Sequence, residues 1–227
     1  MAVKVPVVPV SVIIPAYKSA LTLPATLDSV AGQTARPMEI LICDDGSPVE
    51  SGMAAYLESL GKDYKGIPLR VFRQKNAGAG AARNTCLRHA KGTYVAFLDA
   101  DDQWLPEKLA RSVAVLEAGD YTFVAHDFYA VDGDGWKRLW RCAANFRKVD
   151  WLSKGDPKLH YFYRGFIGIF TVVMRRDAIV KAGGFHGTDR YGLDWEAWHA
   201  LMAKDPTATF CVFEEPLGIY PRSASPG

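Results

Sequence analysis

Residues 7–14 read Val-Val-Pro-Val-Ser-Val-Ile-Ile, and Pro15 ends the run. A short run of β-branched residues that a proline ends is typical of a buried β-strand. Residues 21–31 then carry apolar side chains at helical spacing, which predicts a helix. The chain therefore begins with a strand followed by a helix, and this pair is the unit from which the first half is built.

The strand–helix pair recurs three more times before residue 118. We expect strands at residues 39–43, 69–72 and 94–98 and helices at residues 51–60, 80–90 and 106–116. Strands that alternate with helices about every 25 to 30 residues indicate βαβ units. All four strands are apolar on both faces, as a sheet covered on both sides requires. The sequence thus predicts an α/β fold with a mostly parallel sheet flanked by helices.

The second half of the chain loses this regular alternation. The turn signal Asp132-Gly-Asp-Gly135 predicts a hairpin between strands at residues 124–131 and 136–140. Further strands are expected at residues 170–174 and 209–213, and helices at residues 177–182 and 194–203. We predict a single domain over residues 1–227, with a cofactor-binding half over about residues 1–118 and a smaller, mixed substrate-side half over residues 119–227.

The composition is that of an ordinary globular protein. Of the 227 residues, 49% are hydrophobic and 23% are charged, which excludes a disordered chain, a fibre and a coiled coil. The 27 basic and 25 acidic residues nearly balance, so no nucleic-acid partner is expected. The four cysteines form no C-x-x-C pair, which disfavours a zinc site. Without a signal peptide or an apolar run long enough for a transmembrane segment, we expect a cytoplasmic protein, either free or associated peripherally with the inner face of the membrane.

Polar clusters lie just after the carboxyl end of each expected strand in the first half. They are Pro15-Ala16-Tyr17, Asp44-Asp45-Gly46-Ser47, Asn76 with the Gly78 and Gly80 loop, and Asp99-Ala100-Asp101-Asp102. In an open α/β sheet the ligand crevice lies along this edge. Five acids that converge there would repel one another unless a cation neutralises them, and oxygen ligands favour Mg²⁺ or Mn²⁺ over Zn²⁺.

The last of these clusters has the pattern of a metal site. Asp99 and Asp101 stand two residues apart, so an extended backbone would place both on one face, and Asp102 would point elsewhere unless the chain turns. A metal ion that one or two carboxylates hold keeps open positions for a diphosphate. One acid after a strand is more often a turn former or a helix cap, but three acids in four residues favour a metal site.

Two other ligand-binding patterns are disfavoured. Gly78-Ala-Gly80-Ala-Ala-Arg83 lacks the third glycine of the dinucleotide fingerprint, and it follows the third strand instead of the first. The amino end of the next helix and Arg83 could instead face an anion. A phosphatase of the haloacid-dehalogenase type would need its acid pair after the first strand and a threonine where Gln103 stands.

Taken together, the motifs resemble those of the family 2 glycosyltransferases. They are Val10-Ser-Val-Ile-Ile-Pro-Ala-Tyr17, Asp44-Asp-Gly-Ser47, Asn76-Ala-Gly78 with Ala82-Arg-Asn84, Phe97-Leu-Asp-Ala-Asp-Asp102 with Trp104, Val173-Met-Arg-Arg-Asp177 through Gly183-Gly-Phe185, and Leu193-Asp-Trp-Glu196. The resemblance covers about residues 10–222. It implies an inverting enzyme with the GT-A fold, a Rossmann-like sheet that binds a nucleotide-sugar donor.

The resemblance also implies roles for single residues in donor binding. Pro15, Ala16 and Tyr17 resemble the segment that lines the nucleotide base. Asp45, with Asp44 beside it, resembles the acid that binds the edge of the base, which is uracil in the usual donor.

Metal binding and catalysis follow from the same resemblance. Asp99 resembles the first acid of the family's D-x-D motif, which lies near the ribose or the metal. Asp101 resembles the acid that binds Mn²⁺ or Mg²⁺, and Asp102 is the alternative metal ligand. Asp194 resembles the general base that deprotonates the acceptor hydroxyl. Inversion by direct displacement needs one base opposite the leaving group, and a metal takes up charge on the departing diphosphate.

The chain departs from the family pattern at two places. Leu193 stands where an acid usually precedes the base, and no histidine follows His199, although the family often has a metal-binding histidine near the carboxyl end. Tyr220-Pro-Arg222-Ser223 resembles a degraded form of that segment. These departures leave open a second function, a non-catalytic module that binds a nucleotide sugar or a glycan.

Two tryptophans are candidates for contact with an acceptor, which is a glycan or a lipid-linked sugar of unknown identity. Trp195 lies beside the proposed base, and Trp104 follows the acidic cluster. Either indole could stack on a sugar ring, and either could equally be an aromatic residue of the core.

Overall fold

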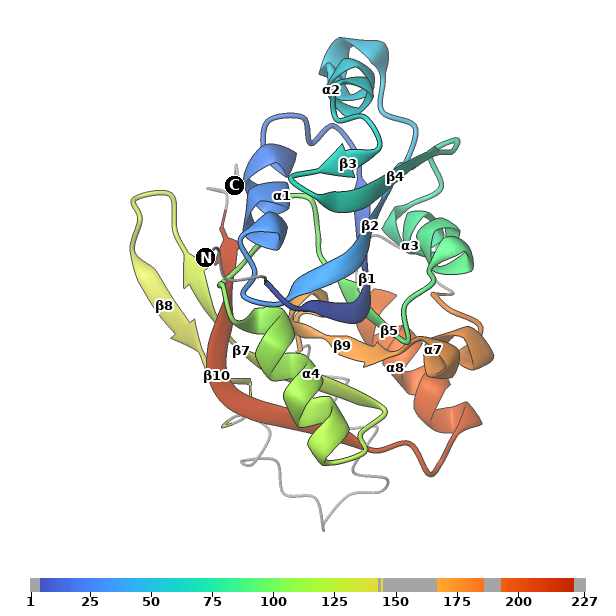
Figure 1. Cartoon of the computed structure of the whole chain (residues 1–227), viewed down its shortest axis with the longest axis vertical. Coiled ribbons are helices and arrows are strands. Elements are labelled where there is room, and N and C mark those ends of the chain that lie inside the picture. The colour runs from blue at the N-terminus through green and yellow to red at the C-terminus, as the bar shows by residue number, and fades with distance from the viewer. Residues whose placement is uncertain (1–4, 143, 145–166, 186–192, 223–227) are drawn as a thin grey trace.

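The computed structural model describes residues 5–142, 144, 167–185 and 193–222. Within these residues the chain forms one ten-stranded sheet with the strand order β3-β4-β2-β1-β5-β9-β7-β10-β6, and β8 pairs with β7 (Figure 1). The strands are β1 (Val7–Ala16), β2 (Arg36–Asp44), β3 (Asp63–Tyr64), β4 (Ile67–Arg73), β5 (Tyr94–Phe97), β6 (Gln103–Trp104), β7 (Phe123–Val131), β8 (Lys137–Trp140), β9 (Val173–Arg175) and β10 (Phe210–Pro221). The α-helices are α1 (Leu23–Ala31), α2 (Met53–Ser59), α3 (Ala79–His89), α4 (Lys108–Ala118), α7 (Arg176–Ala182) and α8 (Leu193–Lys204).

The first half forms the parallel sheet that the alternation predicts. β1 pairs in parallel with β2 on one side and with β5 on the other, and β2 pairs in parallel with β4. The register between β1 and β2 shifts between Val8 and Ser11, a stretch that includes Pro9, which has no N–H to give to a ladder. The predicted fold class, an α/β fold with a mostly parallel sheet flanked by helices, is confirmed.

The second half extends the same sheet with mixed pairing. β9 lies antiparallel to both β5 and β7, while β10 runs parallel to β7 and antiparallel to β6. The predicted hairpin is present as β7 and β8, in which Val131 pairs with Lys137 and Phe128 with Trp140. The described strands of both halves therefore belong to one sheet, and the proposed division of labour near residue 118 stays a prediction.

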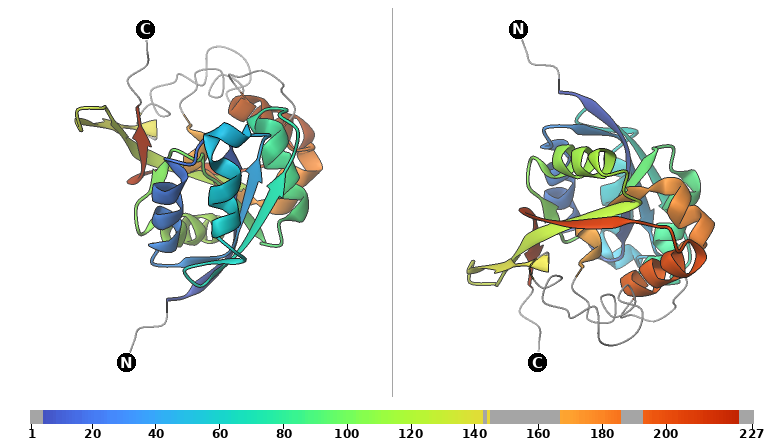
Figure 2. Two further views of the ribbon diagram at one scale, coloured as in Figure 1. Left: turned by 90° about the horizontal axis from the view of Figure 1, so that it is seen from above. Right: turned by 90° about the horizontal axis from the view of Figure 1, so that it is seen from below.

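Helices cover both faces of the sheet, and alternate residues of β1 show how (Figure 2). Val10, Val12 and Ile14 pack in the core under α1, α2 and α4, whereas Ile13 packs in the core under α3, α7 and α8. Successive strand residues point to opposite faces, so a continuous apolar strand supplies both cores. Among the described helices, none is long and apolar enough to cross a membrane.

The observed elements differ from the expected ones where glycine, proline or a short turn intervenes. The helix expected over residues 51–60 is split into a 3₁₀ turn, Val49–Ser51, and α2, because Gly52 between them has a left-handed φ of 69°. The strand expected over residues 170–174 divides into a 3₁₀ turn, Ile169–Thr171, and β9. The last strand is longer than expected, because β10 continues past Pro216 through two register shifts against β7.

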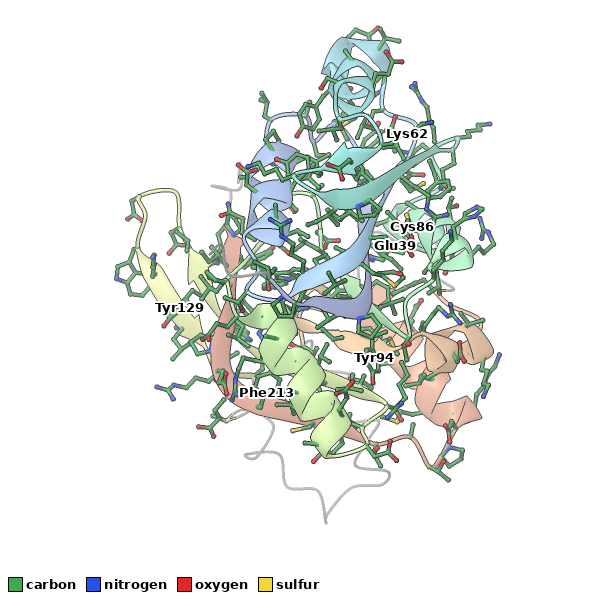
Figure 3. The ribbon with its side chains drawn as sticks, in the orientation of Figure 1. Glu39, Lys62, Cys86, Tyr94, Tyr129 and Phe213 are labelled. Atoms are coloured by element: carbon green, nitrogen blue, oxygen red, sulfur yellow. The ribbon has the colours of Figure 1, made fainter. Side chains whose placement is uncertain are left out.

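A buried acid holds together the edge of the sheet at which β1 and β2 begin. Glu39, labelled in Figure 3, accepts hydrogen bonds from Ser11 Oγ, from the backbone N–H of Lys91 and from Arg70 Nη2, each at 2.7 Å. Burial acts to raise the pKa of Glu39, but these hydrogen bonds outweigh it and hold the pKa below its ordinary value. This carboxylate therefore links β1, β2, β4 and the turn before β5.

One lysine lies fully inside the core beneath α4. Lys108 is 0% exposed, its Nζ lies 3.9 Å from the ring centroid of Trp104, and no hydrogen-bond partner for Nζ is found in the described part of the chain. Burial lowers the pKa of Lys108 well below its ordinary value. Burial also lowers the pKa of His126, a fully buried residue of β7, to about 3, and the charge of Lys108 contributes to this shift.

Replacing Lys108 with methionine should stabilise the fold. The unfolded chain keeps this lysine protonated up to about pH 10.4, whereas the folded protein favours the neutral amine. Between the lowered pKa of folded Lys108 and about pH 10.4, the unfolded state therefore binds more protons than the folded state. The stability of the parent falls as the pH falls through this range. We expect Lys108→Met to gain at least about 1 kcal/mol near neutral pH, with the gain shrinking as the pH rises, in urea denaturation experiments.

The exposed Lys91 provides the matched control, because Lys91→Met should change the free energy of unfolding by less than about 0.5 kcal/mol. A Lys108→Met variant that is less stable than the parent at every pH would show instead that a charged Lys108 stabilises the fold through Trp104.

Candidate functional site

A cleft opens at the carboxyl ends of β1 and β5. From β1 the chain passes to β2 and β4 on one side, and after α3 it returns to β5 on the other side of β1. Such a reversal of strand order leaves a crevice between the two connections, which is where open α/β sheets bind ligands. The cleft has a volume of about 390 Å³. Its lining residues are Pro15, Ala16, Tyr17, Lys18, Ser19, Thr22, Asp45, Ala79, Arg83, Asp99, Ala100 and Asp101.

The segment after β1 forms one wall of the cleft. Pro15, Ala16 and Tyr17 line it as the sequence predicts, and the Tyr17 ring is exposed. Lys18 also lines the cleft, with a left-handed φ of 53°, and its backbone N–H donates to Ser47 Oγ at 2.9 Å. The Lys18 ammonium lies 5.1 Å from the Tyr17 ring centroid. Lys18 is not among the residues predicted for the site, although a lysine directly after the first strand was a signal for a cation there.

Asp45 reaches the cleft but also organises the loop beside it. Its carboxylate accepts hydrogen bonds from the backbone N–H of Ala77 at 3.0 Å, from that of Gly78 at 2.8 Å and from Gln74 Nε2 at 2.8 Å. Gly78 precedes the first residue of α3, so the carboxylate stands at the positive end of this helix. The sequence predicted an anion at this helix end, and in the structure Asp45 is itself an anion there.

Asp44 points away from the cleft, because neighbouring residues at the end of a strand face opposite sides. Its carboxylate accepts the Ser47 N–H at 3.0 Å and lies 3.3 Å from Arg73 Nε. It lines a separate hollow of about 820 Å³ between α2 and β4. Asp44 thus lies outside the cleft that Asp45 lines, and its predicted help in binding the base stays a prediction.

Arg83 and Asp99 form an ion pair across the floor of the cleft. Arg83 Nη2 donates to Asp99 Oδ1 at 2.6 Å, and the side chain of Arg83 is only 4% exposed while that of Asp99 is 34% exposed. The guanidinium also lies 5.4 Å from the ring centroid of Phe185. Both residues line the cleft as predicted, and the pair fixes the Asp99 carboxylate while part of it remains open to a ligand.

The acids after Asp99 separate into one that faces the cleft and one that is buried. The Asp102 N–H donates to the Asp99 carbonyl at 3.1 Å, so the chain turns here instead of staying extended. Asp101 is exposed and lines the cleft, whereas Asp102 is 2% exposed and is not among the lining residues. Partial burial removes water from the Asp101 carboxyl group and raises its pKa, and the nearby charge of Asp99 raises it further.

Tyr220 lies next to this acidic turn. β10 pairs with β6 so that Gly218 faces Trp104 and Ile219 faces Gln103, a register that brings Tyr220 beside Asp102. Burial raises the pKa of Tyr220, and the charges of Asp102, Asp101 and Asp99 add to the shift. Arg222, from the same segment, instead lies with Nη1 3.4 Å from Asp132 Oδ1 of the β7–β8 turn.

The structure describes the side chain of only one of the two candidate tryptophans. Trp104 is 3% exposed and donates its indole N–H to the Phe170 carbonyl at 2.8 Å. A ring so enclosed offers no face to a sugar, so the expectation that Trp104 stacks on an acceptor is not met. The side chains of Trp195 and of the proposed base Asp194 lie outside the described residues, although their backbone forms the first turn of α8.

A pair of hydrogen bonds from one side chain fixes the segment that follows α7. Asn84 Nδ2 donates to the Phe185 carbonyl at 2.7 Å, and Asn84 Oδ1 accepts the Phe185 N–H at 2.9 Å. Gly184 lies against this amide with φ of 77°, and a Cβ at Gly184 would approach Asn84 Oδ1 to 2.3 Å. The pair explains why Ala82-Arg-Asn84 and Gly183-Gly-Phe185, about 100 residues apart, belong to one site.

The donor set at the acidic turn fits a divalent cation that arrives with a diphosphate. No three His, Cys, Asp or Glu side chains of the described residues form a ready-made cage. Asp99 and Asp101, however, line the same cleft, and the pKa of Asp101 is raised first by partial burial and then by the nearby charge of Asp99. Mg²⁺ is typically held in this way, by one or two carboxylates together with the phosphates of a substrate.

Comparison with known families agrees with this geometry. The family model described as "Glycosyl transferase family 2" matches residues 11–180. The chain belongs to this family. The assignment predicted from the motifs is thereby confirmed, and the match includes the segments that form the cleft.

Curated relatives of this family 2 chain are bacterial glycosyltransferases. WfaP of Escherichia coli, named UDP-Glc:alpha-D-GlcNAc-diphosphoundecaprenol beta-1,3-glucosyltransferase, is 34% identical over 125 residues, which cover 55% of this chain and 47% of WfaP. The amylovoran biosynthesis glycosyltransferase AmsB of Erwinia amylovora is 29% identical over 220 residues, which cover 92% of this chain and 68% of AmsB. An uncharacterized Nostoc glycosyltransferase, alr2836, is 36% identical over 66% of this chain and 42% of its own length. The chain thus spans about half the length of WfaP and alr2836.

Solved structures show the fold. Residues 1–349 of S. aureus TarS in complex with UDP match with a TM-score of 0.70 and 20% identity, over 94% of this chain and 60% of that one. The mannosyltransferase PcManGT from Pyrobaculum calidifontis, in complex with GDP-Man and Mn²⁺, matches with a TM-score of 0.65 and 19% identity, over 93% of this chain and 56% of that one. The family 2 chain therefore has the GT-A fold.

Proposed function

We propose that this family 2 chain transfers a sugar from a UDP-linked donor to an acceptor hydroxyl, with inversion and with the help of Mn²⁺ or Mg²⁺. The observation that carries the proposal is the cleft at the topological switch point, which unites Pro15–Tyr17, Asp45, Asp99 and Asp101. Nothing in the fold of the first half requires these polar groups at one place, whereas binding of a nucleotide diphosphate does.

The comparisons support the class of donor. WfaP is named for UDP-Glc, and TarS has been solved in complex with UDP and with UDP-GlcNAc. PcManGT holds GDP-Man, so the fold also accepts another base. The acidic Asp45 at the edge of the cleft suits a base with a ring N–H, which both uracil and guanine carry, so the proposal of uracil rests on the UDP-linked donors of the relatives.

The diphosphate would meet two cations and two acids. Lys18 and Arg83 line the cleft, and both can neutralise phosphate oxygens, although Arg83 is already paired with Asp99. A bound Mn²⁺ or Mg²⁺ would supply positive charge to the departing diphosphate. We infer that Asp101 is the principal protein ligand and that Asp102 is not, because Asp101 lines the cleft whereas Asp102 is buried away from it.

The acceptor would approach between the acidic turn and the amino end of α8. Ala197, Trp198 and Leu201 are buried in the core, so α8 is a rigid support for Asp194 in its first turn. We propose Asp194 as the general base and Trp195 as a contact for the acceptor. WfaP is named for a diphosphoundecaprenol acceptor and AmsB for polysaccharide synthesis, which supports a lipid-linked glycan as the acceptor.

A non-catalytic nucleotide-sugar or glycan-binding module is the second candidate. Leu193 in place of an acid, and the absence of a histidine after His199 in the sequence, favour it. Both candidates bind the donor, and only the first turns it over, so transfer or hydrolysis of UDP-sugars with Mn²⁺ present distinguishes them.

Asp45 and Asp44 offer a matched pair of variants for donor binding. Asp45→Ala removes an acceptor from the cleft and should weaken UDP binding without metal by about 5- to 150-fold, since one such contact contributes roughly 1 to 3 kcal/mol. Asp44→Asn alters an acid outside the cleft and should leave the affinity within about twofold. Isothermal titration calorimetry would measure both. Unchanged UDP affinity in Asp45→Ala, together with lower thermal stability, would assign Asp45 solely to holding the loop before α3.

Asp101→Asn should abolish the part of UDP binding that depends on metal. The amide keeps the shape of the side chain but carries no charge, so Mn²⁺ should no longer tighten binding. Affinity without metal should stay the same or rise, because the cleft then holds one negative charge fewer to repel the diphosphate. Thermal-shift titrations with and without Mn²⁺ give both values. Equal tightening by Mn²⁺ in variant and parent would contradict the assignment.

Asp194→Asn tests the general base. A base contributes about 10²- to 10⁴-fold in rate, so turnover should fall by that range while donor affinity stays nearly constant. If Asp194 only caps α8, asparagine should replace it with little loss, because it caps a helix as well as aspartate does. Steady-state transfer to an identified acceptor is the measurement, and activity within a few-fold of the parent would exclude the catalytic role.

A further inference from the structure

The β7–β8 hairpin projects from the body of the molecule. Figure 1 shows β8 at the margin of the fold, and within the described residues β8 pairs with no strand other than β7. Both views of Figure 2 place the hairpin toward the side opposite the start of β1. The parallel strands run toward that side, so the hairpin projects on the same side of the molecule as the cleft.

The turn of this hairpin holds a tryptophan out in solvent. The Gly135 N–H donates to the Asp132 carbonyl at 2.8 Å, and the Asp132 N–H donates to the Trp136 carbonyl at 3.0 Å. The Trp136 N–H donates to Asp134 Oδ1 at 3.0 Å, and Gly135 has φ of 82°. Trp136 is nevertheless 59% exposed. A turn with this many hydrogen bonds presents the indole on a rigid support.

Exposed basic side chains follow this tryptophan along the chain. Lys137, Arg138 and Arg141 are all exposed. Of the two acids in the turn, Asp132 lies 3.4 Å from Arg222, which offsets its charge. Residues 131–141 hold three basic and two acidic side chains, so this segment carries a formal charge of +1, and the nearby Arg222 adds one more positive charge.

The base of the hairpin is anchored in the core. Trp140 stacks on Phe128 with ring centroids 5.9 Å apart, and Phe128 in turn packs edge-to-face on Phe170 at 5.0 Å. Tyr129, labelled in Figure 3, pairs with Leu139 across the two strands. The tip is thus a rigid extension of the sheet that also carries the cleft.

We propose that the tip of the β7–β8 hairpin, residues 131–141, docks on a membrane surface that contains anionic lipids. Tryptophan prefers the interface between water and lipid, and lysine and arginine gain energy from anionic headgroups within a Debye length of the surface. A partner protein would more commonly present a groove for an apolar anchor, whereas a single exposed indole on a segment with exposed basic residues suits a flat, charged interface. Docking on the membrane does not depend on the proposed function. Only the purpose of docking, which is to bring the cleft to a lipid-linked acceptor, rests on the proposed function.

Co-sedimentation of the full chain with vesicles tests the proposal. The parent should bind vesicles of equal parts phosphatidylcholine and phosphatidylglycerol at low salt, bind less at high salt, and not bind pure phosphatidylcholine. Lys137→Glu with Arg138→Glu should lower the partition constant at least about tenfold, and Trp136→Ser should lower it with the cations intact. The matched control is Val180→Ser with Lys181→Glu on α7, an exposed apolar and basic pair away from the hairpin, which should bind as the parent does.

Thermal denaturation confirms that each variant is folded, and UDP affinity in solution reports the cleft separately. A parent that binds neither kind of vesicle overturns the proposal, as does an equal loss in the α7 control. Light scattering tests whether the tip instead binds a second copy of the chain. If the parent is a dimer, and if Trp136→Ser makes it monomeric without changing vesicle binding, the membrane proposal is overturned. Loss of vesicle binding with intact UDP affinity supports the docking surface whether or not transfer activity is found.

Discussion

The position of β1 at the centre of the parallel sheet is the constraint on which the rest of the structure depends. β1 pairs with β2 and β5 on its two sides, so it has no free edge and its side chains supply both cores. The connections after β1 and β5 then leave in opposite directions, which opens the cleft between them. A strand that was apolar on one face only could not hold this position, because helices cover both faces of the sheet.

Environment, rather than residue type, gives the acids of the cleft their different roles. Asp44 and Asp45 are adjacent, yet one pairs with Arg73 outside the cleft and the other receives two backbone N–H groups inside it. Asp101 and Asp102 are also adjacent, and a turn exposes the first and buries the second. The ion pair between Arg83 and Asp99 places a fixed negative group beside Asp101. In this arrangement a divalent cation would relieve the repulsion that remains between Asp99 and Asp101.

The second half of the chain supports the cleft and extends it outward. β9 joins β5 to β7, so the strand that carries the hairpin belongs to the same sheet as the acidic turn. Asn84 ties α3 to the segment before α8, and β10 brings Tyr220 to Asp102. Elements more than 100 residues apart thus meet at one edge of the sheet, and the basic tip of the hairpin lies on that side of the molecule.

The sequence by itself determined the α/β class, the four parallel strands, the β7–β8 hairpin and most of the cleft lining, because apolar periodicity and turn residues act locally. It also placed Pro15–Tyr17, Asp45, Arg83, Asp99 and Asp101 at one edge, since parallel strands end on the same side. Only the tertiary structure decided which of two adjacent acids faces the cleft, that Trp104 is a core residue, that Lys108 is buried, and that Asp45 stands at the end of α3. Which acid faces the cleft depends on the exact residue at which each strand ends or turns, which apolar periodicity leaves open. The other three depend on which distant residues fill the space beside a side chain, and spacing along the chain carries no information about those neighbours.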